Sequence, residues 1–226
     1  MRIEELVEEY PRLYHMAEDG SWASIKRYGL LSTSALLTLY KYSGIRREQI
    51  ESEWRPEKVA ISCDGLDDAV IRDQKPMRPH ELEKCLLGGM TPKEWYRLIN
   101  GMTFFWVKWS PSVEWFLGGR EYCNTVNLII TVNTGALLAR HESRVTLSGI
   151  NSGSTYFNEQ RYTKPRQRGR GTFKRISDHH LPYVVELAVE YSVPDIADFT
   201  ISVARWIAHR EGYGKPDYEH LEDIWP

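Results

Sequence analysis

Residues 183–195, YVVELAVEYSVPD, are the stretch that most constrains the fold of this chain. The stretch is rich in Val and Tyr and is bordered by prolines, which is typical of a short strand inside a sheet. Because strand side chains alternate between two faces, Val184, Glu186 and Ala188 are predicted to point one way and a more apolar row the other. Glu186 would then line a cleft or lie on the wet face of a half-buried strand.

Length and composition are typical of one globular domain. The chain has 226 residues, of which 42% are apolar and 27% charged, so it can bury a real core. No internal repeat, low-complexity run or linker divides it, and we predict a single domain over residues 1–226. A net charge of −2 excludes a general nucleic-acid coat protein, so any basic site must be local.

The sequence argues against a secreted or membrane protein. It has no run of eighteen apolar residues and no charged-then-apolar leader, and residues 1–10 are typical of an acidic amphipathic helix. We expect a cytoplasmic protein with no membrane partner. Cys63, Cys85 and Cys123 are widely spaced and form no CxxC motif, so neither a disulfide framework nor a zinc site is predicted.

The N-terminal part alternates between extended and helical patterns. Residues 12–16 are predicted to be extended and to carry His15, and the helix that follows ends at Gly29. Residues 30–33 are a second extended piece containing Ser32, before a helix that we expect Ser34 to cap. His15 and the Ser32 hydroxyl would therefore lie at consecutive element ends, where polar groups can converge on a ligand.

Strands and helices continue to mix through the rest of the chain. An aromatic strand is predicted at 102–109, and a near-continuous apolar strand at 124–133 is expected to run through the core. Further strands are predicted at 183–193 and 198–207, and the polar tail at 212–226 is expected to be peripheral. The pattern favours an α+β domain.

A basic segment precedes the strand that carries Glu186. Residues 161–175 contain seven cations and no acid, and Tyr162 and Phe173 add stacking surfaces. The cations are Arg161, Lys164, Arg166, Arg168, Arg170, Lys174 and Arg175. Such a concentration in a slightly acidic protein indicates contact with phosphate, the alternative being a solvated basic loop.

Other motifs exclude several classes of site. His179 and His180 are adjacent and point apart on an extended chain, with no third ligand at helical spacing, so no metal is predicted. Ser152 and Ser154 lie among glycines without a G-x-S-x-G elbow, which argues against a hydrolase triad. The phosphate-binding patterns GxGxxG and Walker A are absent.

Five short pieces occur in an order that resembles a known family. They are Tyr14-His15-Met16, Gly29-Leu30-Leu31-Ser32, Ile50 to Arg55, Thr103-Phe104-Phe105-Trp106, and Val185-Glu186-Leu187-Ala188-Val189 with Val193-Pro194-Asp195-Ile196. In this order the chain resembles the DarT-type ADP-ribosyltransferase toxins and their wider NAD-dependent superfamily. The resemblance spans most of the chain and implies a split β-sheet core with peripheral helices.

The resemblance also implies roles for single residues. Glu186 would be the catalytic carboxylate, and Arg55 would act beside it by contacting a phosphate or the acceptor. His15 would hydrogen-bond the adenine-side ribose of NAD. Ser32 and the Gly29 backbone would help to hold the dinucleotide.

The resemblance further implies an aromatic contact and a recognition loop. Phe105 or Trp106 would stack on nicotinamide, although Phe105 lacks the hydroxyl of the tyrosine expected there, and alternation turns it away from the Trp106 face. The basic segment would recognise the acceptor through Tyr162, Arg166, Arg168, Arg170 and Phe173. Residues 64–100 do not map onto the family and form an inserted region.

The expected chemistry needs one carboxylate and no metal. Cleaving the bond between nicotinamide and ribose builds positive charge on C1′, which a carboxylate such as Glu186 can stabilise while taking a proton from the nucleophile. We therefore expect NAD-dependent transfer of ADP-ribose to a macromolecule, DNA or RNA being favoured, in a toxin or defence effector with an antitoxin as a further partner. The alternatives are an NAD-dependent RNA 2′-phosphotransferase and a non-catalytic nucleotide- or RNA-binding module of the same fold.

Overall fold

The computed structural model describes residues 1–156, 166–180, 182–212 and 214–226. The helices are α1 (Ile3–Glu9), α2 (Trp22–Tyr28), α3 (Thr33–Leu39), α4 (Gly44–Ser52), α5 (Pro79–Cys85), α6 (Pro92–Asn100), α7 (Glu114–Leu117) and α8 (Thr134–His141). The strands are β1 (Arg12–Glu18), β2 (Leu30–Leu31), β3 (Val59–Ile61), β4 (Ala69–Ile71), β5 (Met102–Trp106), β6 (Asn127–Asn133), β7 (Val145–Ser148), β8 (Glu186–Glu190), β9 (Ser192–Val193), β10 (Thr200–His209) and β11 (Asp217–Trp225).

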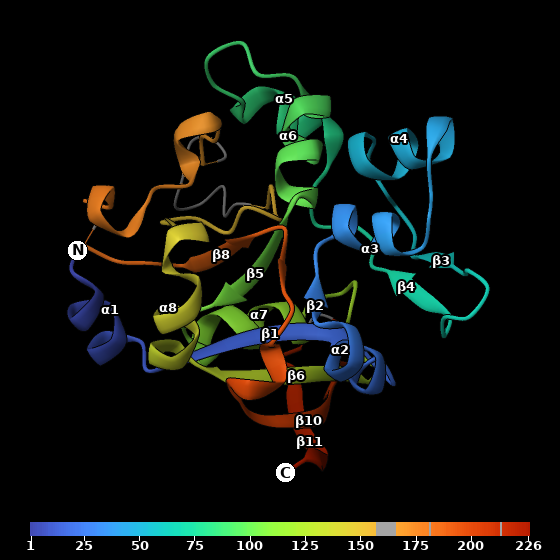
Figure 1. Cartoon of the computed structure of the whole chain (residues 1–226), viewed down its shortest axis with the longest axis vertical. Helices are drawn as coiled ribbons and strands as arrows, with labels where there is room; N and C mark the ends of the chain where they lie inside the picture. The colour runs from blue at the N-terminus through green and yellow to red at the C-terminus, as the bar shows by residue number, and fades with distance from the viewer. Residues whose placement is uncertain (157–165, 181, 213) are drawn as a thin grey trace.

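An antiparallel sheet forms the centre of the molecule (Figure 1). Within the described residues it has seven strands in the order β11-β10-β6-β1-β5-β8-β7. β1 pairs with β6 along its length, from Arg12 to Glu18, whereas the register of β1 and β5 joins Tyr14 to Trp106. The short contact lets the β5-β8-β7 side diverge from the β11-β10-β6-β1 side.

Helices surround this sheet, so the predicted α+β class is confirmed. In Figure 1, α1 and α8 lie on one side, α5 and α6 above β5, and α3 and α4 with the β3–β4 hairpin on the other side. β2 pairs with β9 in a separate two-stranded sheet, as β3 does with β4. No helix among the described ranges is long and apolar enough to cross a membrane.

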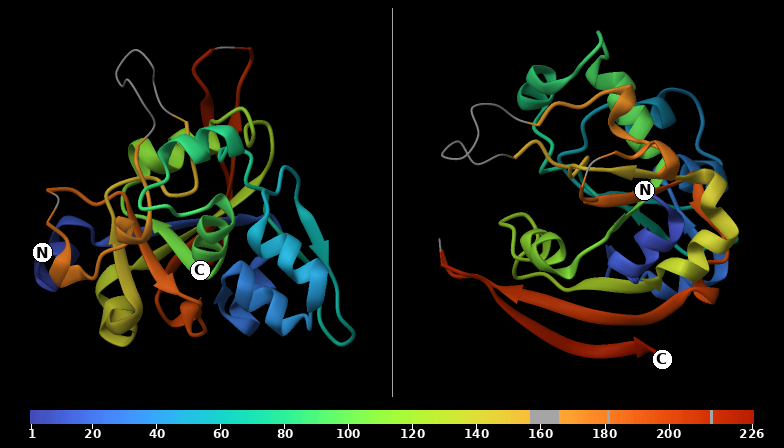
Figure 2. Two further views of the ribbon diagram at one scale, coloured as in Figure 1. Left: turned by 90° about the horizontal axis from the view of Figure 1, so that it is seen from above. Right: turned by 90° about the vertical axis from the view of Figure 1, so that its left-hand side faces the viewer.

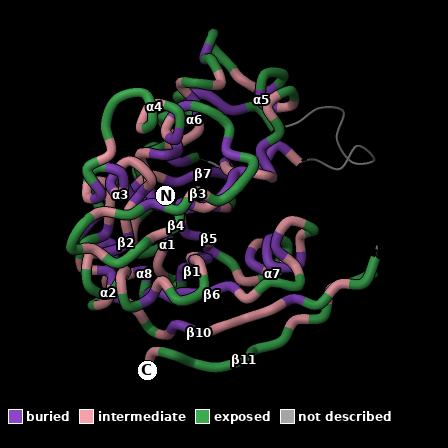
Figure 3. Tube along the Cα trace, turned by 90° about the vertical axis from the view of Figure 1, so that its right-hand side faces the viewer, coloured by how far each residue is buried: buried purple, intermediate pink, exposed green. Residues whose placement is uncertain are grey.

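The main core lies where the sequence is most apolar. β6, predicted as a core strand, buries Leu128, Ile129, Ile130 and Val132 at 1% exposure or less. Leu128, Ile130 and Val132 pack into the main core and Ile129 packs into a second cluster with Phe116 and Tyr122, so both faces of β6 are covered, which explains its near-continuous apolar sequence. Figure 3 shows buried residues concentrated in the central strands, while the outer strand β11 is largely exposed.

Capping explains where two of the helices begin. Ser32, not Ser34, caps α3, because Ser32 is extended and its Oγ accepts a 3.2 Å hydrogen bond from the Ala35 N–H. α6 begins with the reciprocal capping box of Thr91 and Glu94. These caps place Ser32 at the edge of β2 and α6 directly before β5.

Two strands differ from the sequence predictions. The stretch 183–195 is not one strand, since Tyr191 adopts a positive φ of 64° and separates β8 from β9. The tail contains β11, which pairs antiparallel with β10. The right-hand view of Figure 2 shows this hairpin along the lower edge of the molecule, and β11 is the edge strand of the sheet.

Candidate functional site

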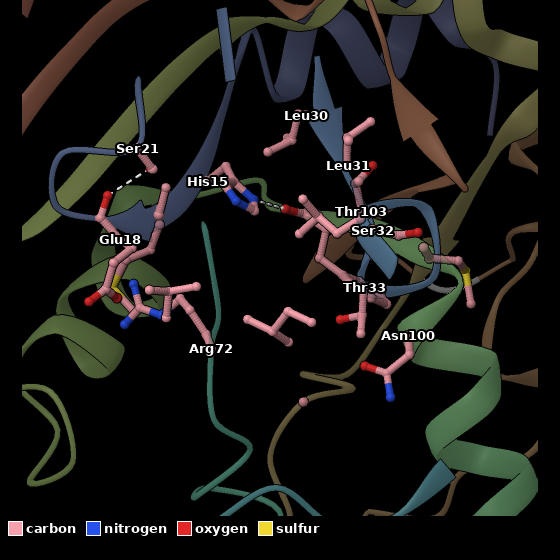
Figure 4. Close-up of a pocket in the computed structure, with 18 of the residues that line it drawn as sticks. His15, Glu18, Ser21, Leu30, Leu31, Ser32, Thr33, Arg72, Asn100 and Thr103 are labelled. Atoms are coloured by element: carbon pink, nitrogen blue, oxygen red, sulfur yellow. Dashed lines mark hydrogen bonds between the residues drawn. The ribbon is translucent and has the colours of Figure 1, made fainter. Parts of the chain in front are cut away.

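A pocket of about 400 Å³ lies between β1, the α2–β2 corner, the segment after β4, β5 and the start of β8. Six of the residues implied by the family resemblance line it. They are His15, Gly29, Ser32, Arg55, Trp106 and Glu186. Figure 4 shows His15 and Ser32 on one side of this pocket and Arg72 and Asn100 on another.

Glu186 is a buried carboxylate in the pocket wall. It is the first residue of β8 and lies opposite Trp106 of β5 and Ser148 of β7. The side chain is 4% exposed, and Oε2 accepts a 2.9 Å hydrogen bond from the Ser152 N–H. Burial raises its pKa to about 7, and the Ser152 hydrogen bond opposes part of that rise. Near neutral pH this carboxylate can therefore accept a proton.

Arg168 supports the loop that holds Glu186. It is 2% exposed and donates from Nη1 to the Ser152 carbonyl at 3.0 Å and from Nη2 to the Ser154 carbonyl at 2.9 Å. Burial lowers the pKa of this guanidinium. The sequence interpretation assigned Arg168 to acceptor binding, but its guanidinium lies in the interior and binds backbone oxygens.

His15 presents a neutral imidazole to the pocket. Its Nδ1 lies 2.8 Å from the Phe104 carbonyl oxygen, which can only accept, so Nδ1 carries the proton and Nε2 has a free lone pair. Burial lowers the pKa of His15 to about 4, and the positive charge of Arg72 adds to this effect. Nε2 is therefore a hydrogen-bond acceptor at neutral pH.

Ser32 and Gly29 shape the corner beside His15. The Ser32 Oγ accepts from the Ala35 N–H, which leaves its O–H proton able to donate. Gly29 has a φ of 87°, and a Cβ built there would lie 2.5 Å from the Pro194 Cα. Glycine is thus required for β2 to approach β9, and the Gly29 N–H already donates to the Ile25 carbonyl.

Arg55 lines the pocket but is held by the protein. It is 7% exposed and donates to the carbonyls of Ile50 and Arg72 and to Asn100 Oδ1, the last at 3.0 Å. Burial lowers its pKa to about 10. Arg55 therefore positions the segment that carries Arg72, and the structure does not present its guanidinium as the phosphate contact that the resemblance implies.

β5 sends its aromatic side chains to different faces, as alternation predicts. Trp106 lines the pocket and packs against Phe116, with ring centroids 4.7 Å apart. Phe105 is fully buried in the main core, its ring centroid 5.8 Å from that of His15. The proposed nicotinamide contact is thus limited to Trp106, and Phe105 packs beneath His15.

The described part of the basic segment, residues 166–175, is not gathered into one recognition surface. Arg166 is exposed and donates to the Gly149 carbonyl, whereas Arg170 forms an exposed ion pair with Glu94 on α6. Phe173 stacks on Trp95, with ring centroids 6.0 Å apart. Tyr162 lies outside the described residues. Arg170 and Phe173 thus contact α6, and the Phe173 ring centroid also lies 5.8 Å from that of Phe104, which lines the pocket.

Sequence reasoning missed three polar side chains in the pocket wall. Tyr28 Oη, Arg72 Nη1 and Asn151 Oδ1 are buried and lack a hydrogen-bond partner among the described residues. Arg72 is oriented by a 2.9 Å bond from Nη2 to Asn127 Oδ1, with its guanidinium 5.1 Å from the centroid of the Tyr122 ring. Buried polar groups are normally satisfied, so these atoms favour a polar ligand.

The signal that would have found Arg72 is its place in the chain. Arg72 directly follows the short strand β4, at an element end where polar groups often meet ligands. It lies in the region 64–100 that did not map onto the family. Within the described residues, no group of three or more His, Cys, Asp or Glu side chains could hold a metal ion.

Comparison with known proteins identifies one family. The sequence profile of DUF7002, described as a family of unknown function, matches residues 11–200. All the residues that line the pocket lie inside this range. No curated protein matches the sequence.

Proposed function

This chain belongs to the DUF7002 family, and we propose that it transfers ADP-ribose from NAD to a macromolecule, with nucleic acid as the favoured acceptor. The observation that carries the proposal is that Glu186 and His15, far apart in sequence, line the same pocket. The proposal includes an ADP-ribosyltransferase-like split sheet, in keeping with the short contact between β1 and β5.

In the proposed reaction the bond between nicotinamide and ribose C1′ breaks, and nicotinamide leaves with the bonding electrons. A nucleophilic atom of the acceptor forms the new bond to C1′. Glu186 in its ionised form stabilises the positive charge at C1′ and takes the proton that the nucleophile loses. Its pKa of about 7 makes this exchange feasible near neutral pH.

Other residues would bind the substrate. His15 Nε2 would accept a hydrogen bond from a ribose hydroxyl, because its Nδ1 proton is already donated to the Phe104 carbonyl. Arg72 Nη1, which lacks a protein partner among the described residues, would contact the pyrophosphate of NAD. Trp106 would stack on nicotinamide and exclude water from C1′.

The proposal also implies that the protein acts in the cytoplasm as a toxin or defence effector and that a partner antitoxin neutralises it. It rests on the family resemblance together with the residues of the pocket.

Incubation with NAD labelled in the adenine tests the proposal against separate pools of DNA, RNA and protein. The expected result is label on nucleic acid and free nicotinamide, both lost in Glu186→Gln. Nicotinamide release that requires a 2′-phosphorylated RNA would instead identify an RNA 2′-phosphotransferase. Failure of NAD to raise the melting temperature, with RNA still bound, would identify a non-catalytic binding module.

A further inference from the structure

A second hollow of about 490 Å³ adjoins the pocket. Pro76, Phe116 and Tyr122 line both hollows, so the second one opens directly beside the proposed reaction site. It lies along α7 and the start of β11, where the Tyr218 hydroxyl donates to the Glu114 carbonyl at 2.9 Å. We call it the α7 groove.

The α7 groove offers an exposed aromatic surface. Trp115 is 48% exposed, and its ring lies edge-on to Phe116, with centroids 5.0 Å apart, and to Tyr156, with centroids 6.1 Å apart. Tyr156 is fixed because its hydroxyl donates to Glu121 and the Arg78 guanidinium lies 4.7 Å from the centroid of its ring. A ring held in place and still accessible is suited to stacking on a planar ligand.

Three arginines share the groove with these rings. Arg78, Arg120 and Arg210 line the groove, against the carboxylates of Glu114 and Glu121. Three cations and two acids leave one positive charge. Arg210 donates from Nη1 to the Gly118 carbonyl at 3.0 Å, and its Nε is buried without a partner among the described residues. The groove therefore combines a stacking ring with an excess of positive charge and an unsatisfied buried donor.

We propose that the α7 groove binds single-stranded nucleic acid, with one base stacked on Trp115 and phosphates near Arg78 and Arg210. The proposal rests on the proposed function and names its acceptor site. An unpaired strand is required because stacking on Trp115 needs a base with a free face. The next nucleotide of the strand would lie along Phe116 and Tyr122, which line both hollows, and would point toward Glu186.

This assignment moves acceptor binding away from the described part of the basic segment. Arg168 binds backbone carbonyls in the interior, and Arg170 is paired with Glu94. Arg78 and Arg210, in contrast, lie beside an exposed Trp and next to the pocket.

The test is fluorescence anisotropy with labelled single strands of about 12 nucleotides, DNA and RNA, and the matching duplex, without NAD. Trp115→Ala is expected to weaken single-strand binding by about tenfold. Trp115→Phe, which keeps a stacking ring, should bind almost as the wild type does. The double variant Arg78→Gln/Arg210→Gln should reduce the slope of log affinity against log salt by roughly 0.7 for each phosphate that is no longer neutralised. Arg170→Gln, in the basic segment, is the matched control and should leave binding unchanged.

Two results would overturn the groove assignment: equal affinity of wild type and Trp115→Ala, or binding that depends on Arg170. Duplex binding as tight as single-strand binding would overturn the proposal that the groove requires an unpaired strand. The proposed function has a separate readout, because NAD binding by the pocket, measured as a rise in melting temperature, needs no oligonucleotide. Single-strand binding that depends on Trp115, with no nicotinamide release, would support the groove and refute the enzyme.

Discussion

The Ser152 N–H donates a 2.9 Å hydrogen bond to Oε2 of Glu186. The same residue, Ser152, accepts through its carbonyl from buried Arg168. The carboxylate at the start of β8 is therefore held by a loop that another buried side chain fixes in place. The orientation of Glu186 therefore depends on three segments that are separate in the sequence: β8 itself, the loop that contains Ser152, and the segment that carries Arg168.

Glu186→Gln is expected to abolish ADP-ribose transfer. The amide has nearly the same size, but it cannot take a proton or stabilise positive charge at C1′ as a carboxylate does. Addition of NAD should still raise the melting temperature of the variant, since His15 and Arg72 remain. Label transfer at the wild-type rate would remove Glu186 from the mechanism.

The stability of the protein should fall as the pH rises from about 4.5 to about 7. Burial raises the pKa of Glu186 from 4.5 to about 7, so the folded state holds a proton over this range that the unfolded state has released. Over this whole pH range the free energy of unfolding should fall by roughly 3 kcal/mol. Urea unfolding at pH 5 and pH 8 measures the free energy of unfolding of the wild type and of Glu186→Gln. The variant should be more stable than the wild type at pH 8 but not at pH 5. A constant difference between the two proteins would contradict a raised pKa.

Arg168→Met should destabilise the protein by roughly 3 kcal/mol, because two charged hydrogen bonds to the Ser152 and Ser154 carbonyls are removed. The pH profile of any remaining transferase activity should also shift, since Ser152 would no longer hold Glu186. The matched control is Arg170→Met, whose ion pair with Glu94 is exposed, and it should leave the melting temperature nearly unchanged. Similar melting temperatures for the two variants would be inconsistent with a buried role for Arg168.

Arg72→Gln should weaken NAD binding by roughly tenfold, because the charged hydrogen bond to the pyrophosphate would be absent. Titration calorimetry with NAD measures the effect, and ADP-ribose is expected to lose affinity by a similar factor because it carries the same pyrophosphate. Arg46→Gln, at an exposed position on α4, provides a control of equal charge change. Equal affinities of the Arg72 and Arg46 variants would place the pyrophosphate elsewhere.

Local patterns predicted several elements well. The apolar run of β6, the capping box of Thr91 and Glu94, and the alternation that separates Phe105 from Trp106 all depend on near neighbours in the chain. His15 and Glu186 were each identified from short motifs. Their position around one pocket required the pairing of β1 with β5 and of β5 with β8.

The sequence by itself determined which residues prefer strands and helices, where α6 begins, and which strand is buried on both faces. Only the tertiary structure decided which charged residues face a ligand. Arg168 and Arg170 are two positions apart in one basic segment, yet one is 2% exposed and binds carbonyls while the other's side chain is 79% exposed. The reason is that a guanidinium is buried only where long-range packing supplies acceptors for its donors, and composition does not reveal those acceptors.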